Sequence, residues 1–145
     1  MSPNEIKYDL LKTELSLTQS QMDKYDQLSS TVKTWTMTIW AASVGWAIQS
    51  HEPSVSLLGG AAVVFFWVLD AYLMMFRLNY RARRDDVAGA LGAYAEKGEF
   101  PAGTKALDLP THDNGGLIRS FSVVRLSLPY AVLAVLTAAV FFIVI

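Results

Sequence analysis

The stretch SVSLLGGAAVVFFWVLDAYLMMF, residues 54–76, decides how the rest of the chain can fold. It is almost entirely apolar and carries one charged side chain, the carboxylate of Asp70. At about 1.5 Å per residue this segment is roughly 34 Å long, which is enough to cross a hydrocarbon core of about 30 Å. The sequence therefore predicts a membrane-spanning helix with one acid that needs a partner or an interfacial position.

Two further apolar blocks, residues 34–50 and 123–145, flank this segment in a chain that is 52% hydrophobic. We expect an all-α integral membrane protein with three transmembrane helices. The net charge of -1 argues against binding to duplex nucleic acid, and the absence of cysteine excludes disulfides and thiolate metal sites.

The segment before the first span is predicted to be a long helix. Ser2, Pro3 and Glu5 have the spacing of an N-cap, a first helical residue and a capping-box acid. No glycine or proline interrupts the chain between Pro3 and Gly45, so this helix is expected to continue into the first span. Its largely apolar stripe follows a three-and-four spacing: Tyr8, Leu11, Leu15, Thr18, Met22, Tyr25, Ser29 and Val32.

A short turn at residues 51–53 makes the first two spans an antiparallel hairpin, and both helices are predicted to extend beyond the membrane as a cytoplasmic stalk. The second helix should continue through a stripe at Tyr80, Val87, Leu91 and Tyr94 to an end near Gly98. The expected parts are therefore an amphipathic helix (1–33), a two-span hairpin (34–76), a helical extension (77–98), a return loop (99–119) and a third transmembrane helix (120–145).

The hairpin also predicts which residues lie side by side. Residues at equal depth should have numbers that add to about 103, which places Arg77 across from Asp26 and Lys33 beside Asp70. Lys and Arg are abundant before the first span and between the second and third spans, whereas residues 51–53 contain none. By the positive-inside rule we expect a bacterial inner-membrane location, with the N-terminus cytoplasmic and the C-terminus periplasmic.

Asp70 has two interpretations. It lies about 24 Å from Ser54 along the helix, near the inner edge of the hydrocarbon core, where an ion pair with Lys33 is the first expectation. Alternatively, copies of Asp70 form an acidic ring at the cytoplasmic mouth of a cation-conducting oligomer.

Arg77, Arg81 and Arg84 recur at helical spacing just after the second span. They could bind phosphate groups of anionic lipids or of a nucleotide-like messenger, because guanidinium groups bind phosphate oxygens in a bidentate manner. The alternative is a topology signal whose charges are paired with Asp23, Asp26, Asp85 and Asp86.

Aromatic residues of the first two spans are candidates for a hydrophobic gate, chiefly Trp40, Phe66 and Trp67. Interhelical or lipid-facing packing is the competing interpretation. His112 and Asp113 are adjacent, but two histidines and no cysteine make a metal site improbable, and no catalytic set is recognisable. We expect no enzymatic activity, no metal and no cofactor.

This layout resembles a family of small bacterial antiphage-defence membrane effectors, the SLATT-type effectors and the membrane effector of the Hailong nucleotidyltransferase system. The resemblance rests on the N-terminal helix, the tight hairpin, the basic run RLNYRARR at residues 77–84 and the further span. It implies a homo-oligomer that opens or disrupts the membrane on a nucleotide cue or through a nucleotidyltransferase partner. The competing function is a non-conducting membrane anchor or assembly subunit whose stalk docks a partner enzyme.

Overall fold

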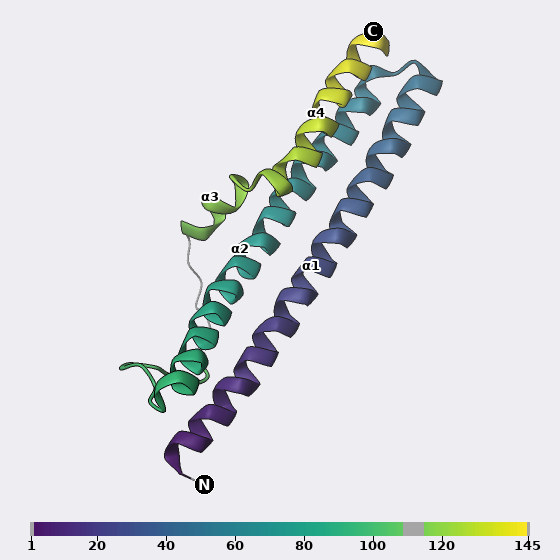
Figure 1. Cartoon of the computed structure of the whole chain (residues 1–145). Coiled ribbons are helices and arrows are strands. Elements are labelled where there is room, and N and C mark those ends of the chain that lie inside the picture. Colours follow the sequence, from purple (N-terminus) through teal and green to yellow (C-terminus); the bar gives the residue numbers. More distant parts are fainter. Residues whose placement is uncertain (1, 109–114, 145) are drawn as a thin grey trace. The chain divides into compact units, whose positions relative to one another are not determined.

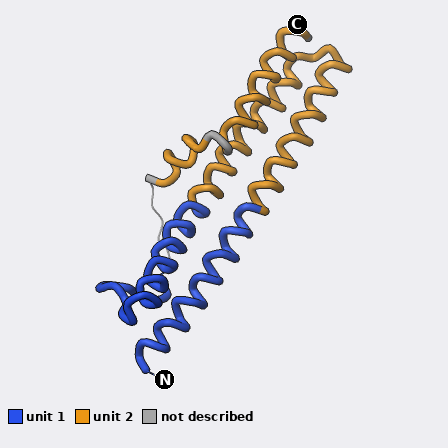
Figure 2. Tube along the Cα trace, viewed as in Figure 1, with its two compact units in different colours: residues 1–26, 76–114 blue, residues 27–75, 115–145 orange. Residues whose placement is uncertain are grey.

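The computed structural model describes residues 2–108 and 115–144, and within them the secondary structure is all helical. The elements are α1 (Pro3–Ser50), α2 (Pro53–Lys97), α3 (Gly115–Phe121) and α4 (Val124–Val144) (Figure 1). The chain divides into two compact units, unit 1 with residues 1–26 and 76–114 and unit 2 with residues 27–75 and 115–145 (Figure 2). Helices α1 and α2 each contribute to both units.

The predicted ends of the two long helices are confirmed. Glu5 N donates to Ser2 Oγ at 3.3 Å and Ser2 N donates to the Glu5 carboxylate, so the capping box begins α1 at Pro3. At the other end of the hairpin, α2 stops at Lys97 and Gly98 takes a φ of 72°, a left-handed conformation that glycine adopts without steric cost.

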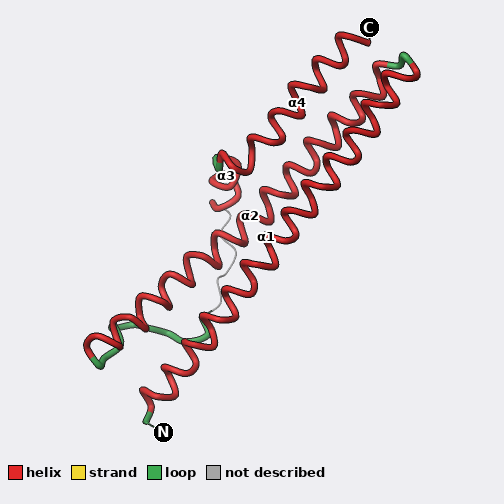
Figure 3. Tube along the Cα trace, turned by 45° about the vertical axis from the view of Figure 1, so that its right-hand side comes forward, coloured by secondary structure: helices red, strands yellow, loops and turns green. Residues whose placement is uncertain are grey.

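Within each unit α1 and α2 run in opposite directions (Figure 3), and the residue pairs below confirm the predicted register. In unit 1 the rings of Tyr8 and Tyr94 are 5.7 Å apart, and Arg77 forms an ion pair with Asp26. In unit 2 Lys33 pairs with Asp70. The numbers in these pairs add to 102 or 103, as the predicted hairpin requires.

Each unit has its own core. In unit 1 the buried residues are Leu11, Glu14, Thr18 and Met22 of α1 with Val87 and Ala90 of α2. In unit 2, α1, α2 and α4 share a core around the cluster of Val63, Tyr130 and Leu133. The predicted stripes therefore face the partner helices, except that Glu14 is fully buried where Leu15 was expected.

Two helices in the described residues are long and apolar enough to cross a membrane: α2 and the 18-residue segment Leu126–Ile143 of α4. The first predicted span, residues 34–50, is helical but too polar to meet this criterion, because threonine and serine interrupt it. The predicted return loop also needs correction, since α3 is a helix at residues 115–121. Its entry, a Gly-Gly pair, carried no helical periodicity to predict it.

Glycine at position 59 allows α1 and α2 to approach closely in unit 2. A Cβ atom added there would lie 2.9 Å from Ser43 Cβ, whereas one added at Gly45 would meet nothing within 4 Å. We expect Gly59→Ala to lower the stability of the protein by about 1–3 kcal/mol through overpacking. Gly45→Ala is the matched control and should be neutral or stabilising by up to about 1 kcal/mol, because alanine favours the helix. Thermal unfolding of both variants in mild detergent, followed by circular dichroism, measures the difference; equal stabilities would contradict the close approach.

Candidate functional site

A buried polar cluster centred on Asp70 joins three helices of unit 2. Lys33 Nζ of α1 lies 3.3 Å from Asp70 Oδ2, and the hydroxyl of Tyr130 in α4 donates to the same oxygen at 3.0 Å. Ser29 Oγ donates to Asp70 Oδ1 and accepts a hydrogen bond of 3.0 Å from Lys33 Nζ. The predicted ion pair is therefore present, and Ser29 and Tyr130 complete it.

The burial and the hydrogen bonds of Asp70 favour a structural role within one chain. The side chain of Asp70 is 0% exposed, whereas that of Lys33 is 31% exposed and keeps part of its hydration. Both carboxylate oxygens accept hydrogen bonds, which offsets the desolvation of the charge. A carboxylate enclosed by its own helices does not face an axis between copies, so the geometry supports the ion pair and not the acidic ring.

The three arginines of α2 that were candidates for phosphate binding lie close to acidic side chains. Arg77 pairs with Asp26 of α1, Arg84 Nη2 lies 2.6 Å from Asp85 Oδ1, and Arg81 Nε lies 4.0 Å from Asp85 Oδ2. The side chains of Arg81 and Asp85 are both more than half exposed, so their pairing contributes little to stability. Two of the four acids proposed as partners are thus engaged, while the arginine most open to an external phosphate is Arg81.

The gate candidates take part in interhelical packing. Trp40, Phe66 and Trp67 are partly buried and pack against the cluster of Val63, Tyr130 and Leu133. Trp40 Nε1 also donates to Thr137 Oγ1 of α4 at 2.9 Å, and the ring of Trp67 meets that of Phe121 at 5.3 Å, edge to face. These contacts support the packing interpretation that competed with the gate.

A second buried acid, Glu14, forms a cluster in unit 1 that the sequence analysis missed. Arg83 Nε donates to Glu14 Oε1 at 2.7 Å and Arg83 Nη2 donates to Oε2 at 3.1 Å, a bidentate pair between α1 and α2. The backbone N–H of Leu107 donates to Glu14 Oε2 at 2.8 Å, and Arg83 Nη2 donates to the carbonyl of Lys105 at 2.7 Å. We call these four residues the loop clasp, because they fasten the segment after α2 to both helices.

Glu14 stabilises the charged form of Arg83 within the loop clasp. Hydrogen bonding to Glu14 raises the pKa of the Arg83 guanidinium above its usual range, against the opposing effect of burial. The Glu14 side chain is 1% exposed and that of Arg83 is 16% exposed, so water screens this pair weakly. A signal for it existed in the sequence, although neither residue was part of the predicted stripes. Glu14 is three residues after Leu11 of the first stripe, and Arg83 is three residues after Tyr80 of the second. A charged residue beside an apolar stripe requires a partner when it is buried.

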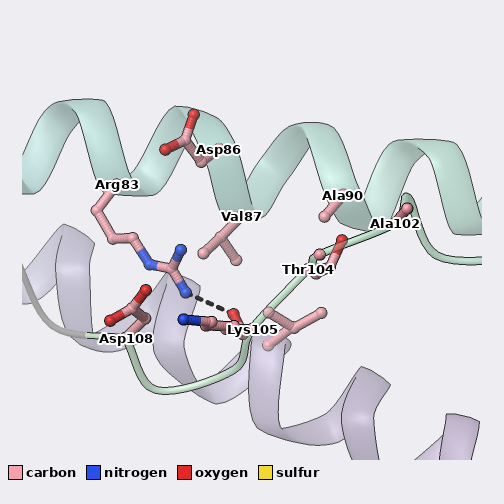
Figure 4. A pocket seen from close by; sticks show the side chains of 10 residues that line it. Arg83, Asp86, Val87, Ala90, Ala102, Thr104, Lys105 and Asp108 are labelled. Carbon is pink, nitrogen blue, oxygen red and sulfur yellow. Dashed lines mark hydrogen bonds between the residues drawn. The ribbon is translucent and has the colours of Figure 1, made fainter.

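Beside the loop clasp is a cavity of about 260 Å³ (Figure 4). Val87 and Ala90 form its apolar wall, and its charged lining is balanced between Arg83 with Lys105 and Asp86 with Asp108. The volume is below the range of about 300–1,000 Å³ that is usual for drug-sized ligands. It could hold a small polar molecule, and the balanced charge selects neither anions nor cations.

Among residues 2–108 and 115–144, no three side chains of His, Cys, Asp or Glu gather as a metal site would require. His112 and Asp113, the pair considered in the sequence, lie outside the described residues.

The described residues form an all-α protein with two helices long and apolar enough to cross a membrane. Its unit 1 also contains a buried ion pair, between Glu14 and Arg83. No known family model, curated protein or solved structure matches the chain.

Proposed function

We propose that the chain crosses the membrane three times, with residues 34–50 of α1 as the first span. Within unit 2 this segment packs directly on the two apolar helices: Ser43 contacts α2 at Gly59, and Trp40 bonds to Thr137 of α4. Its hydroxyl groups are satisfied within the helix, since Thr34, Thr36, Thr38 and Ser43 each donate to a carbonyl four residues earlier. Five of its outward side chains are large and apolar: Trp35, Met37, Ile39, Trp46 and Ile48. A bilayer around α2 and α4 would also surround this segment.

The positive charges before the first of these three spans and between the second and third support a topology with unit 1 in the cytoplasm and the C-terminus in the periplasm of a bacterial inner membrane. In this topology unit 2 contacts membrane lipids. Unit 1 is then the part of the protein that can bind cytoplasmic molecules.

We further propose that the protein is a homo-oligomeric membrane effector that opens or disrupts the bilayer when a cytoplasmic cue acts on unit 1. The observation that carries this proposal is an uncovered apolar ridge on α1, made of Ile6, Leu10 and Leu17, which are 48%, 39% and 51% exposed. These residues fall within about 40° of one another on a helix of 3.6 residues per turn. In the cytoplasm such a ridge is stabilised by contact with another protein surface, here a further copy.

A conducting path would lie between copies. The polar cluster of Asp70 and the aromatic residues considered for a gate are both used in packing within one chain. In this proposal the cytoplasmic cue binds at Arg81, whose side chain is the most exposed of the three candidate arginines. A role in antiphage defence, with a nucleotide messenger or a nucleotidyltransferase partner as the cue, rests on the resemblance in layout.

The second candidate function is a non-conducting membrane anchor whose stalk docks a partner enzyme. The same packing of Asp70, Trp40, Phe66 and Trp67 favours it, since these were the residues expected to conduct or gate. In this case the ridge of Ile6, Leu10 and Leu17 binds the partner enzyme instead of a further copy.

Induced expression in bacteria carrying a membrane-potential dye separates the two functions. We expect the effector to depolarise cells when its cue is present, and the double variant Leu10→Lys with Leu17→Lys to abolish depolarisation by preventing assembly. Gln19→Lys, at an exposed position on the same helix, is the matched control and should behave as the parent chain. A protein that is monomeric in mild detergent and in nanodiscs would contradict the effector, and unchanged potential under every cue would favour the anchor.

A further inference from the structure

The short helix α3 presents an apolar side chain away from the rest of unit 2. Ile118 is 77% exposed, whereas Ser120, two residues later and therefore about 200° around the helix, is fully buried. Figure 1 shows that α3 does not continue the axis of α4 but turns away from it. The buried face of α3 is therefore the face of Ser120, and the side chain of Ile118 on the other face is left largely uncovered.

The position of α3 is fixed by contacts at its C-terminal end. The ring of Phe121 meets that of Trp67 in α2 at 5.3 Å, edge to face. The turn into α4 is closed by backbone hydrogen bonds from Ser122 N to Arg119 O and from Val123 N to Ser120 O, both 3.2 Å. Ser127 Oγ of α4 donates to Phe121 O at 2.6 Å. These bonds hold α3 at a defined angle to the transmembrane segment that follows it.

The depth of this contact can be read along α2. Trp67 is one helical turn from Asp70 on the side of Ser54, so it lies about 20 Å from the start of the second span and roughly 10 Å inside the inner edge of a hydrocarbon core of about 30 Å. The ring contact therefore brings the C-terminal end of α3 to within about 10 Å of that edge. An exposed isoleucine at that depth meets the boundary between acyl chains and headgroups, where apolar side chains of interfacial helices are buried.

The positive charge of α3 suits the headgroup side of that boundary, where lipid phosphates lie. Arg119 is its single charged residue; the helix contains no acid. An arginine next to an exposed isoleucine fits a surface that offers hydrocarbon and phosphate together. From the burial pattern, the fixed angle and this charge, we propose that α3 is an interfacial helix that binds the cytoplasmic leaflet, with Ile118 among the acyl chains and Arg119 on the phosphates of anionic lipids.

This proposal rests on the proposed membrane insertion, and its test separates the two. The chain has no cysteine, so Ile118→Cys can be labelled alone with an environment-sensitive fluorophore in the full-length protein. The labelled protein is placed in vesicles of phosphatidylcholine, or of phosphatidylcholine and phosphatidylglycerol in equal parts. Lipids carrying a nitroxide near the headgroup or near the end of the acyl chain then quench the fluorophore according to its depth.

We expect the shallow nitroxide to quench the label at position 118 at least about twofold more than the deep one, as an interfacial position requires. A label at Val135→Cys, exposed on α4, should be quenched best by the deep nitroxide, and one at Gln19→Cys on α1 by neither. Loss of quenching at position 135 would overturn membrane insertion itself. Deep quenching at 135 with none at 118 would overturn only the interfacial helix, as would a disulfide between copies of Ile118→Cys, which would show that a second copy covers this face.

The role of charge has its own readout. Adding Arg119→Gln to the Ile118→Cys chain should remove the extra quenching that phosphatidylglycerol produces over phosphatidylcholine alone. Leu117→Ala, which leaves the charge in place, is the matched control. Equal quenching in the two lipid mixtures before and after Arg119→Gln would overturn the contact with anionic lipid.

Discussion

Asp70→Ala is expected to lower the stability of the protein by about 3 kcal/mol, near the lower end of the range for breaking a buried ion pair. The substitution removes the acceptor for Ser29 and Tyr130 and the counter-charge of Lys33. We place the value at the lower end because the Lys33 side chain is 31% exposed and can be solvated again. Thermal unfolding in mild detergent, with the parent chain in the same detergent, measures the loss.

Two further variants assign this loss to the individual contacts of Asp70. Tyr130→Phe removes one hydrogen bond and should cost about 1 kcal/mol. Combining Asp70→Ala with Lys33→Ala completes a double-mutant cycle in which the two effects should be non-additive, because the residues share one interaction. Additive effects would show that the pair does not contribute to the packing of α1 on α2.

Glu14→Ala is expected to have the larger effect, about 3–5 kcal/mol, because its partner Arg83 is largely buried and remains charged. The variant also leaves the N–H of Leu107 without its acceptor. The segment after α2 should then open, and the amide of Leu107 should exchange its hydrogen at a rate near that of an unprotected chain. Hydrogen exchange by mass spectrometry measures the opening, and circular dichroism measures stability.

The controls for Glu14 test the cause of the opening. Glu14→Gln keeps the shape and one acceptor but removes the charge, so it should be intermediate in both measurements. Lys12→Ala, an exposed neighbour on the same helix, should change neither. A Glu14→Ala protein in which the Leu107 amide stays protected would contradict the role of the loop clasp.

Features that depend on local sequence and helical period could be predicted. The capping box at Ser2 and Glu5 needs only neighbouring residues, and the end of α2 at Lys97 follows from the glycine after it. The pairs Arg77 with Asp26 and Lys33 with Asp70 followed from one tight turn, because a hairpin of two straight helices has a single register.

Contacts made by the segment after α2 and by α4 could not be predicted in this way. Tyr130 reaches Asp70 across 60 residues, and Leu107 reaches Glu14 across 93. No turn or period relates these positions, since the chain between them contains irregular segments. The helix α3 was missed for the same reason: seven residues beginning with two glycines carry too little pattern to distinguish a helix from a loop.

Some of the candidate sites could be predicted from the sequence, and others could not. The sequence offered nearby acids as partners for the three arginines, and two of these acids, Asp26 and Asp85, do pair with them. Composition could not decide whether Trp40, Phe66 and Trp67 line a pore or fill the space between helices, because aromatic residues serve in both. That choice depends on how α4 packs, and the bond from Trp40 to Thr137 of α4 favours packing.

The crossing of the membrane by α1 is the claim on which the proposed function depends. Single cysteines at Gln19 on α1, at Glu52 in the turn and after Ile145 can be labelled in intact cells with a membrane-impermeant maleimide that enters the periplasm. The proposed topology predicts rapid labelling at Glu52 and after Ile145, and labelling at Gln19 only once the inner membrane is permeabilised. Labelling of Gln19 and Glu52 from the same side would contradict it.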